Sequence, residues 1–184
     1  MASFAFFAPP REIYSVVVLG LGSNLGDSRR IVLDALESLK SVLSDLRCAS
    51  LYETAPLHVV DQNHFINTAA AGFFPGPPNA ASAFKLLERI HEIEALFGRD
   101  RKQERRWGER FLDIDILLFG DLILNEPELN IPHPRLKERR FALEPLLELF
   151  PDAVEPGSGL SYRKICDSLP DQGVKNDKMR RGKW

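Results

Sequence analysis

The apolar residues of the chain change their spacing along its length, and each change predicts a new element. Residues 14–19 (YSVVVL) are rich in β-branched side chains and precede a glycine-rich turn, which predicts a buried strand. From Ser28 onward, apolar residues recur at i, i+3, i+4 and i+7, which predicts a helix capped by Asp27 or Ser28. Apolar runs over 47–54 and 65–74 then predict two strands.

A second helix and a further strand complete the regular pattern. The apolar stripe of residues 80–97 predicts a helix that stops at Gly98, and residues 111–119 (FLDIDILLF) predict the strongest strand. This βαββαβ order is the split-βαβ or ferredoxin-like arrangement. We therefore predict an α+β fold whose mixed or antiparallel sheet has helices on one face, with C-terminal additions. The additions are a short strand at 122–124 and helices near 141–149 and 161–168.

Length and composition agree with a single domain over residues 1–184. The chain has 44% hydrophobic and 27% charged residues, as ordinary globular proteins do. We expect residues 1–12, which are apolar and contain two prolines, to be a flexible extension, and residues 173–184 to be a flexible basic tail. Two cysteines cannot build a disulfide framework, and no apolar run reaches the length of a membrane span, so we predict a cytoplasmic chain.

The formal net charge of −2 hides a segregation of charge along the chain. Residues 99–110 carry six basic and three acidic side chains, and residues 135–140 carry four basic and one acidic. Apart from the basic tail, the rest of the chain carries a net negative charge. This distribution favours local anion sites and argues against a generally basic surface for nucleic acid.

Asp113 and Asp115 are the only charged residues of the 111–119 strand. Residues i and i+2 of a strand share a face, so both carboxylates point the same way, with Cα atoms about 6.5–7 Å apart. The same alternation places Leu117 and Phe119 on their face. Paired carboxylates at this spacing suit the two-metal geometry of phosphoryl chemistry, and hard oxygen ligands favour Mg²⁺. The alternative is a pair of acids at the wet end of a strand, bridged to nearby arginines.

Basic residues immediately precede this strand. Arginine suits bidentate phosphate contacts, so a polyphosphate held between metal and guanidinium groups is one interpretation of residues 99–110. A solvated charge run is the other. Trp107 can stack on a purine base or pack in the hydrophobic core. No Walker motif occurs, and Gly20–Gly26 lacks the third glycine of a dinucleotide fingerprint.

Other polar and aromatic residues extend the candidate site. The prolines on either side of His133 fix its backbone, so its imidazole can contact phosphate, as can Arg139, although a loop histidine is often plain polar surface. Phe65 and Phe141 can sandwich a flat heterocycle whose edge Asn67 would contact. Core packing is the alternative for both rings.

The segment Arg106–Asp115 (RWGERFLDID), with Gly22-Ser23-Asn24 before it and Pro132-His133 after it, resembles the 6-hydroxymethyl-7,8-dihydropterin pyrophosphokinase family. The similarity runs from about Val16 to Leu149 in matching order and spacing. It implies a ferredoxin-like monomer of folate biosynthesis, which transfers pyrophosphate from ATP to the hydroxymethyl group of the pterin and releases AMP.

The resemblance also implies roles for individual residues. It implies two Mg²⁺ ions that bridge the ATP triphosphate and are held by Asp113 and Asp115, and lids formed by residues 55–64 and 99–109. The implied catalytic residues are Arg99, Arg101, Arg110, Asp113 and Asp115. The implied ATP contacts are His91, Glu94, Arg106, Trp107, Ile116, His133 and Arg139. The implied pterin contacts are Thr54, Pro56, Leu57, Phe65, Asn67, Asp113 and Phe141.

Two other functions fit the same order of elements less well. An RNA-recognition module also folds βαββαβ, but it carries exposed aromatics on a central strand where this chain has two acids, which would repel phosphate without metal. An inactive relative that only binds the pterin or a protein partner would not need the acids and arginines that this sequence retains.

Overall fold

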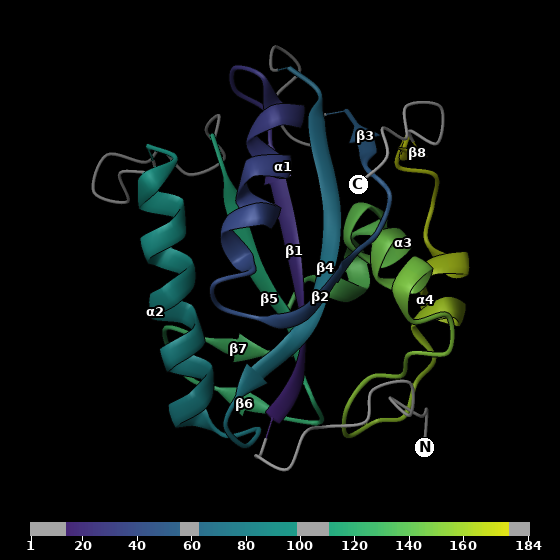
Figure 1. Ribbon diagram of the computed structural model, residues 1–184. Coiled ribbons are helices and arrows are strands. Elements are labelled where there is room, and N and C mark those ends of the chain that lie inside the picture. The colour runs from purple at the N-terminus through teal and green to yellow at the C-terminus, as the bar shows by residue number, and fades with distance from the viewer. Residues whose placement is uncertain (1–13, 56–62, 99–110, 177–184) are drawn as a thin grey trace.

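A six-stranded antiparallel sheet forms the centre of the computed structural model, which describes residues 14–55, 63–98 and 111–176 (Figure 1). The strands follow the order β5-β1-β4-β3-β8, and β2 pairs with β4 beside this path. Each pairing between neighbours is antiparallel. The strands are β1 (Tyr14–Ser23), β2 (Ser44–Cys48), β3 (Tyr52–Thr54), β4 (Phe65–Pro75), β5 (Asp113–Phe119) and β8 (Lys175–Asn176).

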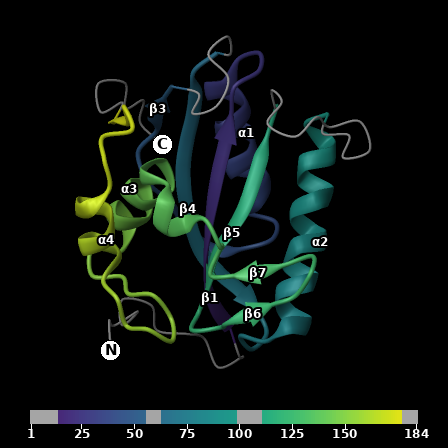
Figure 2. The same cartoon turned by 180° about the vertical axis from the view of Figure 1, so that it is seen from behind.

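Helices cover both faces of the sheet (Figures 1 and 2). Helices α1 (Ser28–Leu39) and α2 (Ala80–Leu96) bury their apolar stripes against one face, in a core cluster that includes Leu19, Leu36 and Leu86. Helices α3 (Arg140–Leu149) and α4 (Tyr162–Ser168) pack on the other face, in a second cluster. A hairpin of β6 (Leu124–Asn125) and β7 (Asn130–Ile131) lies near the edge strand β5 (Figure 2).

The ends of the first two helices follow the capping residues of the sequence. The Asp27 carboxylate accepts a hydrogen bond from the Arg30 backbone N–H at 3.1 Å, and Asn79 caps α2 in the same way through Ser82. Gly98, which follows the C-cap residue Phe97 of α2, has φ +82°, a conformation that favours glycine. The predicted ferredoxin-like α+β fold is confirmed, with α1 and α2 on one face and the C-terminal additions on the other.

The single strand predicted over 47–54 is wrong, because two strands occupy this part of the chain. Ser50 directs its backbone N–H to the Glu148 carboxylate at 3.1 Å, and its carbonyl accepts a hydrogen bond from the Thr68 hydroxyl at 3.1 Å. Side chains therefore use the backbone groups that would otherwise continue the ladder. The pairing with β4 ends at Cys48 and resumes at Tyr52.

The strict alternation predicted for β5 holds through Leu117 and is wrong for Leu118 and Phe119. The register with β1 shifts by one residue, so that Leu19 pairs with Ile116 and Val18 pairs with Leu118. The extra residue, Leu117, is a β-bulge that moves the following side chains to opposite faces. Phe119 consequently lies in the cluster under α1 and α2, and Leu117 and Leu118 lie in the cluster under α3.

Two residues of the segment that we expect to be a flexible basic tail, 173–184, form a strand. Lys175 and Asn176 form β8, which pairs with Glu53 and Tyr52 of β3 and so extends the sheet. Residues 177–184, like residues 1–13, lie outside the described part of the chain. Of the helices in the described ranges, none is both long enough and apolar enough to cross a membrane.

Candidate active site

The sheet register places the two aspartates beside the polar end of β4. Across the sheet, Asn67 of β4 pairs with Gly22 of β1, and Gly22 pairs with Asp113 of β5. Two residues along β1, Gly20 pairs with Asp115. The pairing is regular here and the bulge comes later, so Asp113 and Asp115 share a face as predicted from their spacing. The same face carries Asn67.

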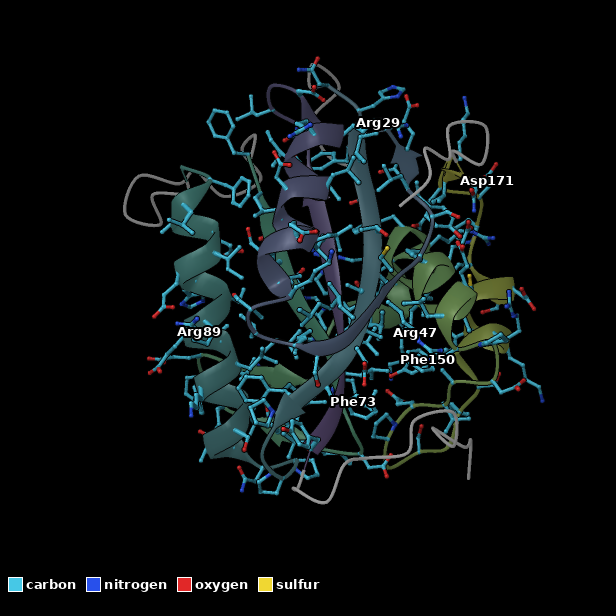
Figure 3. All side chains as sticks on the ribbon, viewed as in Figure 1. Arg29, Arg47, Phe73, Arg89, Phe150 and Asp171 are labelled. Carbon is cyan, nitrogen blue, oxygen red and sulfur yellow. The ribbon has the colours of Figure 1, made fainter. Side chains whose placement is uncertain are left out.

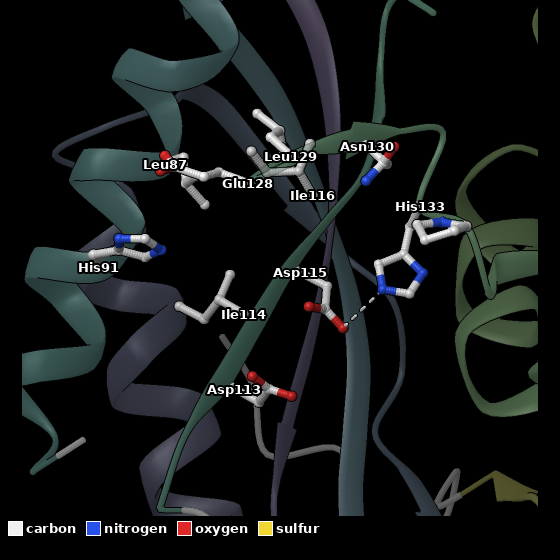
Figure 4. A pocket seen from close by; sticks show the side chains of 11 residues that line it. Leu87, His91, Asp113, Ile114, Asp115, Ile116, Glu128, Leu129, Asn130 and His133 are labelled. Atoms are coloured by element: carbon white, nitrogen blue, oxygen red, sulfur yellow. Dashed lines mark ion pairs between the residues drawn. The ribbon is translucent and has the colours of Figure 1, made fainter. Parts of the chain in front are cut away.

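A cavity of about 530 Å³ opens at the outer edge of β5, and both aspartates line it (Figure 4). Its walls come from α2, from β5, from the β6–β7 hairpin and from the segment that follows β7. Among the implied ATP contacts, His91, Ile116 and His133 line it. Sequence reasoning did not single out the other lining residues as ligand contacts: Leu87, Ile114, Glu128, Leu129, Asn130 and Pro134.

Two basic side chains lie beside Asp115. The His133 Nε2 and a terminal nitrogen of Arg139 each lie 3.7 Å from Asp115 Oδ2, and Figure 4 shows the first of these contacts. The backbone explains how His133 reaches this position, because its N–H donates to the carbonyl of Leu117 at 3.0 Å. The bulge in β5 thus anchors the segment that presents the imidazole to the aspartates.

Burial and the neighbouring guanidinium of Arg139 lower the pKa of His133 to about 4, although Asp113 opposes the shift. The imidazole is therefore uncharged at neutral pH and can exchange hydrogen bonds without adding charge. Burial also lowers the pKa of the Arg139 guanidinium, and the Asp115 carboxylate opposes this shift; the guanidinium keeps its charge because arginine is not deprotonated in proteins. The positive charge of the described residues in contact with Asp115 comes from this guanidinium.

The donor set at the aspartates fits Mg²⁺ bound together with a phosphate ligand. Within the described ranges, no group of three or more His, Cys, Asp or Glu side chains could hold a metal ion by itself. Asp113 and Asp115 therefore offer two carboxylates from a half-exposed position beside a cavity. Mg²⁺ commonly takes only one or two protein carboxylates and fills its octahedron with substrate phosphate and water.

The implied pterin contacts Thr54, Phe65, Asn67 and Phe141 gather over the same face of the sheet. The Asn67 amide nitrogen donates to the Thr54 hydroxyl at 2.8 Å, and both side chains are buried. A Cβ at position 22 would lie 2.9 Å from Asn67 Oδ1, so the glycine makes room for this amide. Phe65 lies two residues before Asn67 on β4. The Arg139 guanidinium carbon lies over the Phe141 ring, 5.5 Å from the ring centroid.

Glu94 occupies a different position from the implied ATP contacts His91, Ile116 and His133. It is not among the residues that line the cavity, and it is only 1% exposed. Its carboxylate accepts a hydrogen bond from the backbone N–H of Ile114 at 2.8 Å, between the two aspartates.

The remaining implied residues lie outside the described part of the chain, as do residues 56–62 of the implied lid 55–64 and all of the implied lid 99–109. These residues are Pro56, Leu57, Arg99, Arg101, Arg106, Trp107 and Arg110.

Comparison with known proteins connects this site to one family. The family model described as 7,8-dihydro-6-hydroxymethylpterin-pyrophosphokinase (HPPK) matches residues 18–151. The 2-amino-4-hydroxy-6-hydroxymethyldihydropteridine pyrophosphokinase of Aquifex aeolicus is 35% identical over 88% of this chain and 94% of that protein. The folate synthesis bifunctional protein of Arabidopsis thaliana is 40% identical over 76% of this chain, and the folic acid synthesis protein fol1 of Pneumocystis carinii is 36% identical over 86%.

The relatives differ in length. This chain spans 24% of the Arabidopsis protein and 21% of the Pneumocystis protein, so the matched region is a small part of each. The fold is similar to that of wild-type Plasmodium falciparum HPPK-DHPS with pterin and p-hydroxybenzoate, with a TM-score of 0.63 and 17% identity. That alignment covers 87% of this chain and 42% of the Plasmodium chain. At this level of identity the similarity shows the fold.

Proposed function

Because the chain belongs to the 7,8-dihydro-6-hydroxymethylpterin-pyrophosphokinase family, we propose that it makes the pterin diphosphate of folate biosynthesis. ATP donates its pyrophosphoryl group to the hydroxymethyl oxygen of 6-hydroxymethyl-7,8-dihydropterin, and AMP leaves. The observation that carries this proposal is the placement of Asp113 and Asp115 on one face, between the cavity at the edge of β5 and Asn67.

Two Mg²⁺ ions are part of the proposal, and Asp113 and Asp115 are the residues that would hold them. The bound metal would neutralise phosphate charge and orient the triphosphate. The protein's own contribution is position and charge: the Arg139 guanidinium suits bidentate phosphate contacts, and the neutral His133 offers a hydrogen bond beside it. Arg99, Arg101, Arg106, Trp107 and Arg110 are proposed to complete the phosphate site.

The pterin would lie on the other side of the aspartates. Phe65 and Phe141 are proposed to stack on its two faces, and Asn67 to contact its edge. The hydrogen bond between Asn67 and Thr54 supports this arrangement, because it fixes the amide before substrate arrives. Bringing the hydroxymethyl oxygen and the β-phosphorus into line is the main catalytic task in such transfers. Pro56 and Leu57 are proposed to complete this pocket.

The test of the proposed function is a product analysis. The protein is mixed with ATP, Mg²⁺ and 6-hydroxymethyl-7,8-dihydropterin, and the nucleotides are separated by chromatography. We expect one AMP for each pterin converted, no ADP, and no AMP when the pterin is left out. ADP with free phosphate, or AMP formed without pterin, would contradict the proposal.

We also propose that the chain acts as a monomer. Light scattering coupled to size exclusion tests this, with a mass near the 20.8 kDa of one chain as the expected result. A dimer mass would refute the monomer and leave the proposed reaction in place.

A further inference from the structure

The backbone of β5 has an open edge at the position of the aspartates. Within the described residues, β5 is the outermost strand of the sheet and pairs only with β1. Backbone N–H groups on the outer side of an edge strand need partners from outside the sheet. Among the described residues, side-chain or backbone contacts from outside the sheet reach one N–H and one carbonyl of β5. Glu94 accepts from the Ile114 N–H at 2.8 Å, and the Leu117 carbonyl accepts from the His133 N–H at 3.0 Å.

The position of Glu94 is unfavourable for a carboxylate. The residue is 1% exposed, and burying a charge is costly unless strong hydrogen bonds compensate for the lost hydration. It also lies in the last turn of α2, where the helix dipole disfavours negative charge. An exposed position on the same helix would avoid both costs, so an acid here points to a role that depends on the contact it makes.

That contact acts on the peptide unit between the two aspartates. The Ile114 nitrogen belongs to the peptide bond that joins Asp113 to Ile114, and Ile114 lies between the acids on β5 (Figure 4). Holding this N–H fixes the plane of the peptide, and therefore the direction in which the Asp113 and Asp115 side chains leave the strand. A charge-assisted hydrogen bond is shorter and stronger than a neutral one, which suits this task.

We propose that Glu94 is a positioning residue for the Asp113–Asp115 pair, which acts by latching the open edge of β5 to α2. It touches neither ATP nor pterin. This inference rests on the proposed function, because the pair matters only if it binds Mg²⁺ and phosphate. It assigns to Glu94 a role different from the ATP contact that the family resemblance implies.

Two substitutions separate the hydrogen bond from the charge. Glu94→Gln keeps an oxygen that can accept from Ile114 and removes the charge, whereas Glu94→Leu removes the acceptor and keeps a similar volume. Glu92→Gln is the matched control, because Glu92 is two residues away on α2, is exposed, and pairs with Arg89. Arg89 is labelled on this helix in Figure 3.

The first measurement needs neither substrate nor metal. Amide hydrogen exchange followed by NMR reports on the Ile114 N–H in each variant. We expect the Ile114 N–H to exchange about tenfold or more faster in Glu94→Leu, because local opening of the strand edge no longer has to break a hydrogen bond to residue 94. We expect exchange close to that of the unmodified protein in Glu94→Gln and in Glu92→Gln.

The second measurement is Mn²⁺ binding in the presence of α,β-methylene-ATP, followed by electron paramagnetic resonance, together with kcat and KM. Outer partners of metal-binding carboxylates typically change affinity or activity by about 10–100-fold. We expect such a loss in Mn²⁺ affinity and kcat for Glu94→Leu, with the KM for pterin little changed. For Glu94→Gln, we expect the Mn²⁺ affinity and kcat to stay within about fivefold of the values for the unmodified protein.

Two results would overturn the inference. If Glu94→Leu speeds Ile114 exchange while Mn²⁺ affinity and kcat stay unchanged, Glu94 merely seals the edge. If Glu94→Gln loses as much Mn²⁺ affinity and kcat as Glu94→Leu while its Ile114 N–H stays protected from exchange, the charge of Glu94 itself acts on ligands. Should Glu94→Leu fail to fold, Glu94→Gln measured against Glu92→Gln decides alone. Failure of the proposed function is distinct, because the unmodified protein would then release no AMP, while Ile114 exchange and Mn²⁺ binding would still report on the latch.

Discussion

The two sides of β1 show how one strand serves two purposes. On the side toward α1 and α2, Val17, Leu19 and Leu21 belong to one continuous apolar cluster. On the other side the strand carries Val18 and then only glycine, at positions 20 and 22. The glycines leave space that neighbouring strands fill, and at position 22 the space holds the buried amide of Asn67. One side therefore provides stability, and the other makes room for polar side chains.

The aspartates provide the largest expected effect on the polar side. Asp113→Ala and Asp115→Ala each remove half of the proposed metal-binding pair, so we expect AMP formation to fall by more than the about 100-fold typical of outer partners. Both residues are only half-buried and line a cavity, so thermal unfolding should change little. Initial rates of AMP formation and melting curves, measured on the same samples, check this.

A matched control is Asp121→Ala, an exposed acid just beyond β5, which should leave the rate unchanged. Rates within threefold of the unmodified protein for either site variant would break the assignment of the polar side to metal-dependent chemistry.

A substitution on the apolar side of β1 should have the opposite character. Leu19 is fully buried, and Leu19→Ala should lower the free energy of unfolding by about 2–5 kcal/mol, through lost transfer energy and a cavity. Chemical denaturation measures this loss. The kcat for each folded molecule should stay unchanged, because the leucine contacts the core and not the site. A fall in kcat without a fall in stability would show that the two sides of β1 are not separate.

Gly22→Ala tests the space that the polar side keeps open. The added Cβ would lie 2.9 Å from Asn67 Oδ1, too close for any side chain, so the amide must move. Small misplacements at a reacting centre cost as much as about 100-fold in rate. Because Asn67 is proposed to contact the pterin, we expect the KM for pterin to rise more than the KM for ATP. Steady-state kinetics with each substrate varied separately measure the two values.

Gly20→Ala on the same strand is the control, because its Cβ would meet the flexible side chain of Leu117 at 3.3 Å. Equal changes in both variants would mean that position 22 has no special relation to Asn67.

The sequence predicts the apolar side of the sheet better than the polar side, for a physical reason. Burial under α1 and α2 imposes a local period that the chain must show, so these helices and residues 14–19 of β1 can be predicted from spacing alone. Residues 20–23, predicted as part of a turn, continue the strand. The bulge at Leu117 leaves no such trace, because Leu117, Leu118 and Phe119 are all apolar and fit either face. The pair Asp113 and Asp115 was predictable because its spacing lies within one regular stretch of strand.

The remaining site features depend on contacts between distant parts of the chain. Glu128 and Asn130 reach the cavity only because the β6–β7 hairpin lies beside β5, and a two-residue strand has no period to detect. The contact of Glu94 with Ile114 requires knowing that β5 is the edge strand, which is a property of the sheet order. Side chains that act on a backbone edge are therefore found from topology rather than from motifs.

The smallest expected effect concerns the contacts that hold the segment with helices α3 and α4 against the polar side of the sheet. The Lys137 ammonium contacts the Glu155 carboxylate at 2.7 Å, and the Ser158 hydroxyl donates to its other oxygen at 2.6 Å. These contacts, the lysine first, lower the pKa of Glu155 below its usual 4.5. The ionised carboxylate therefore stabilises the folded state above that pH, and the contribution is lost as the pH falls through the lower folded value. Glu155→Gln should lower the free energy of unfolding by less than about 1 kcal/mol at pH 7, and by progressively less below pH 4.5. Urea unfolding at each pH measures this loss. Glu88→Gln, on the exposed face of α2, is the comparison; a Glu155→Gln deficit that stayed constant with pH would show that shape and not charge fastens this segment.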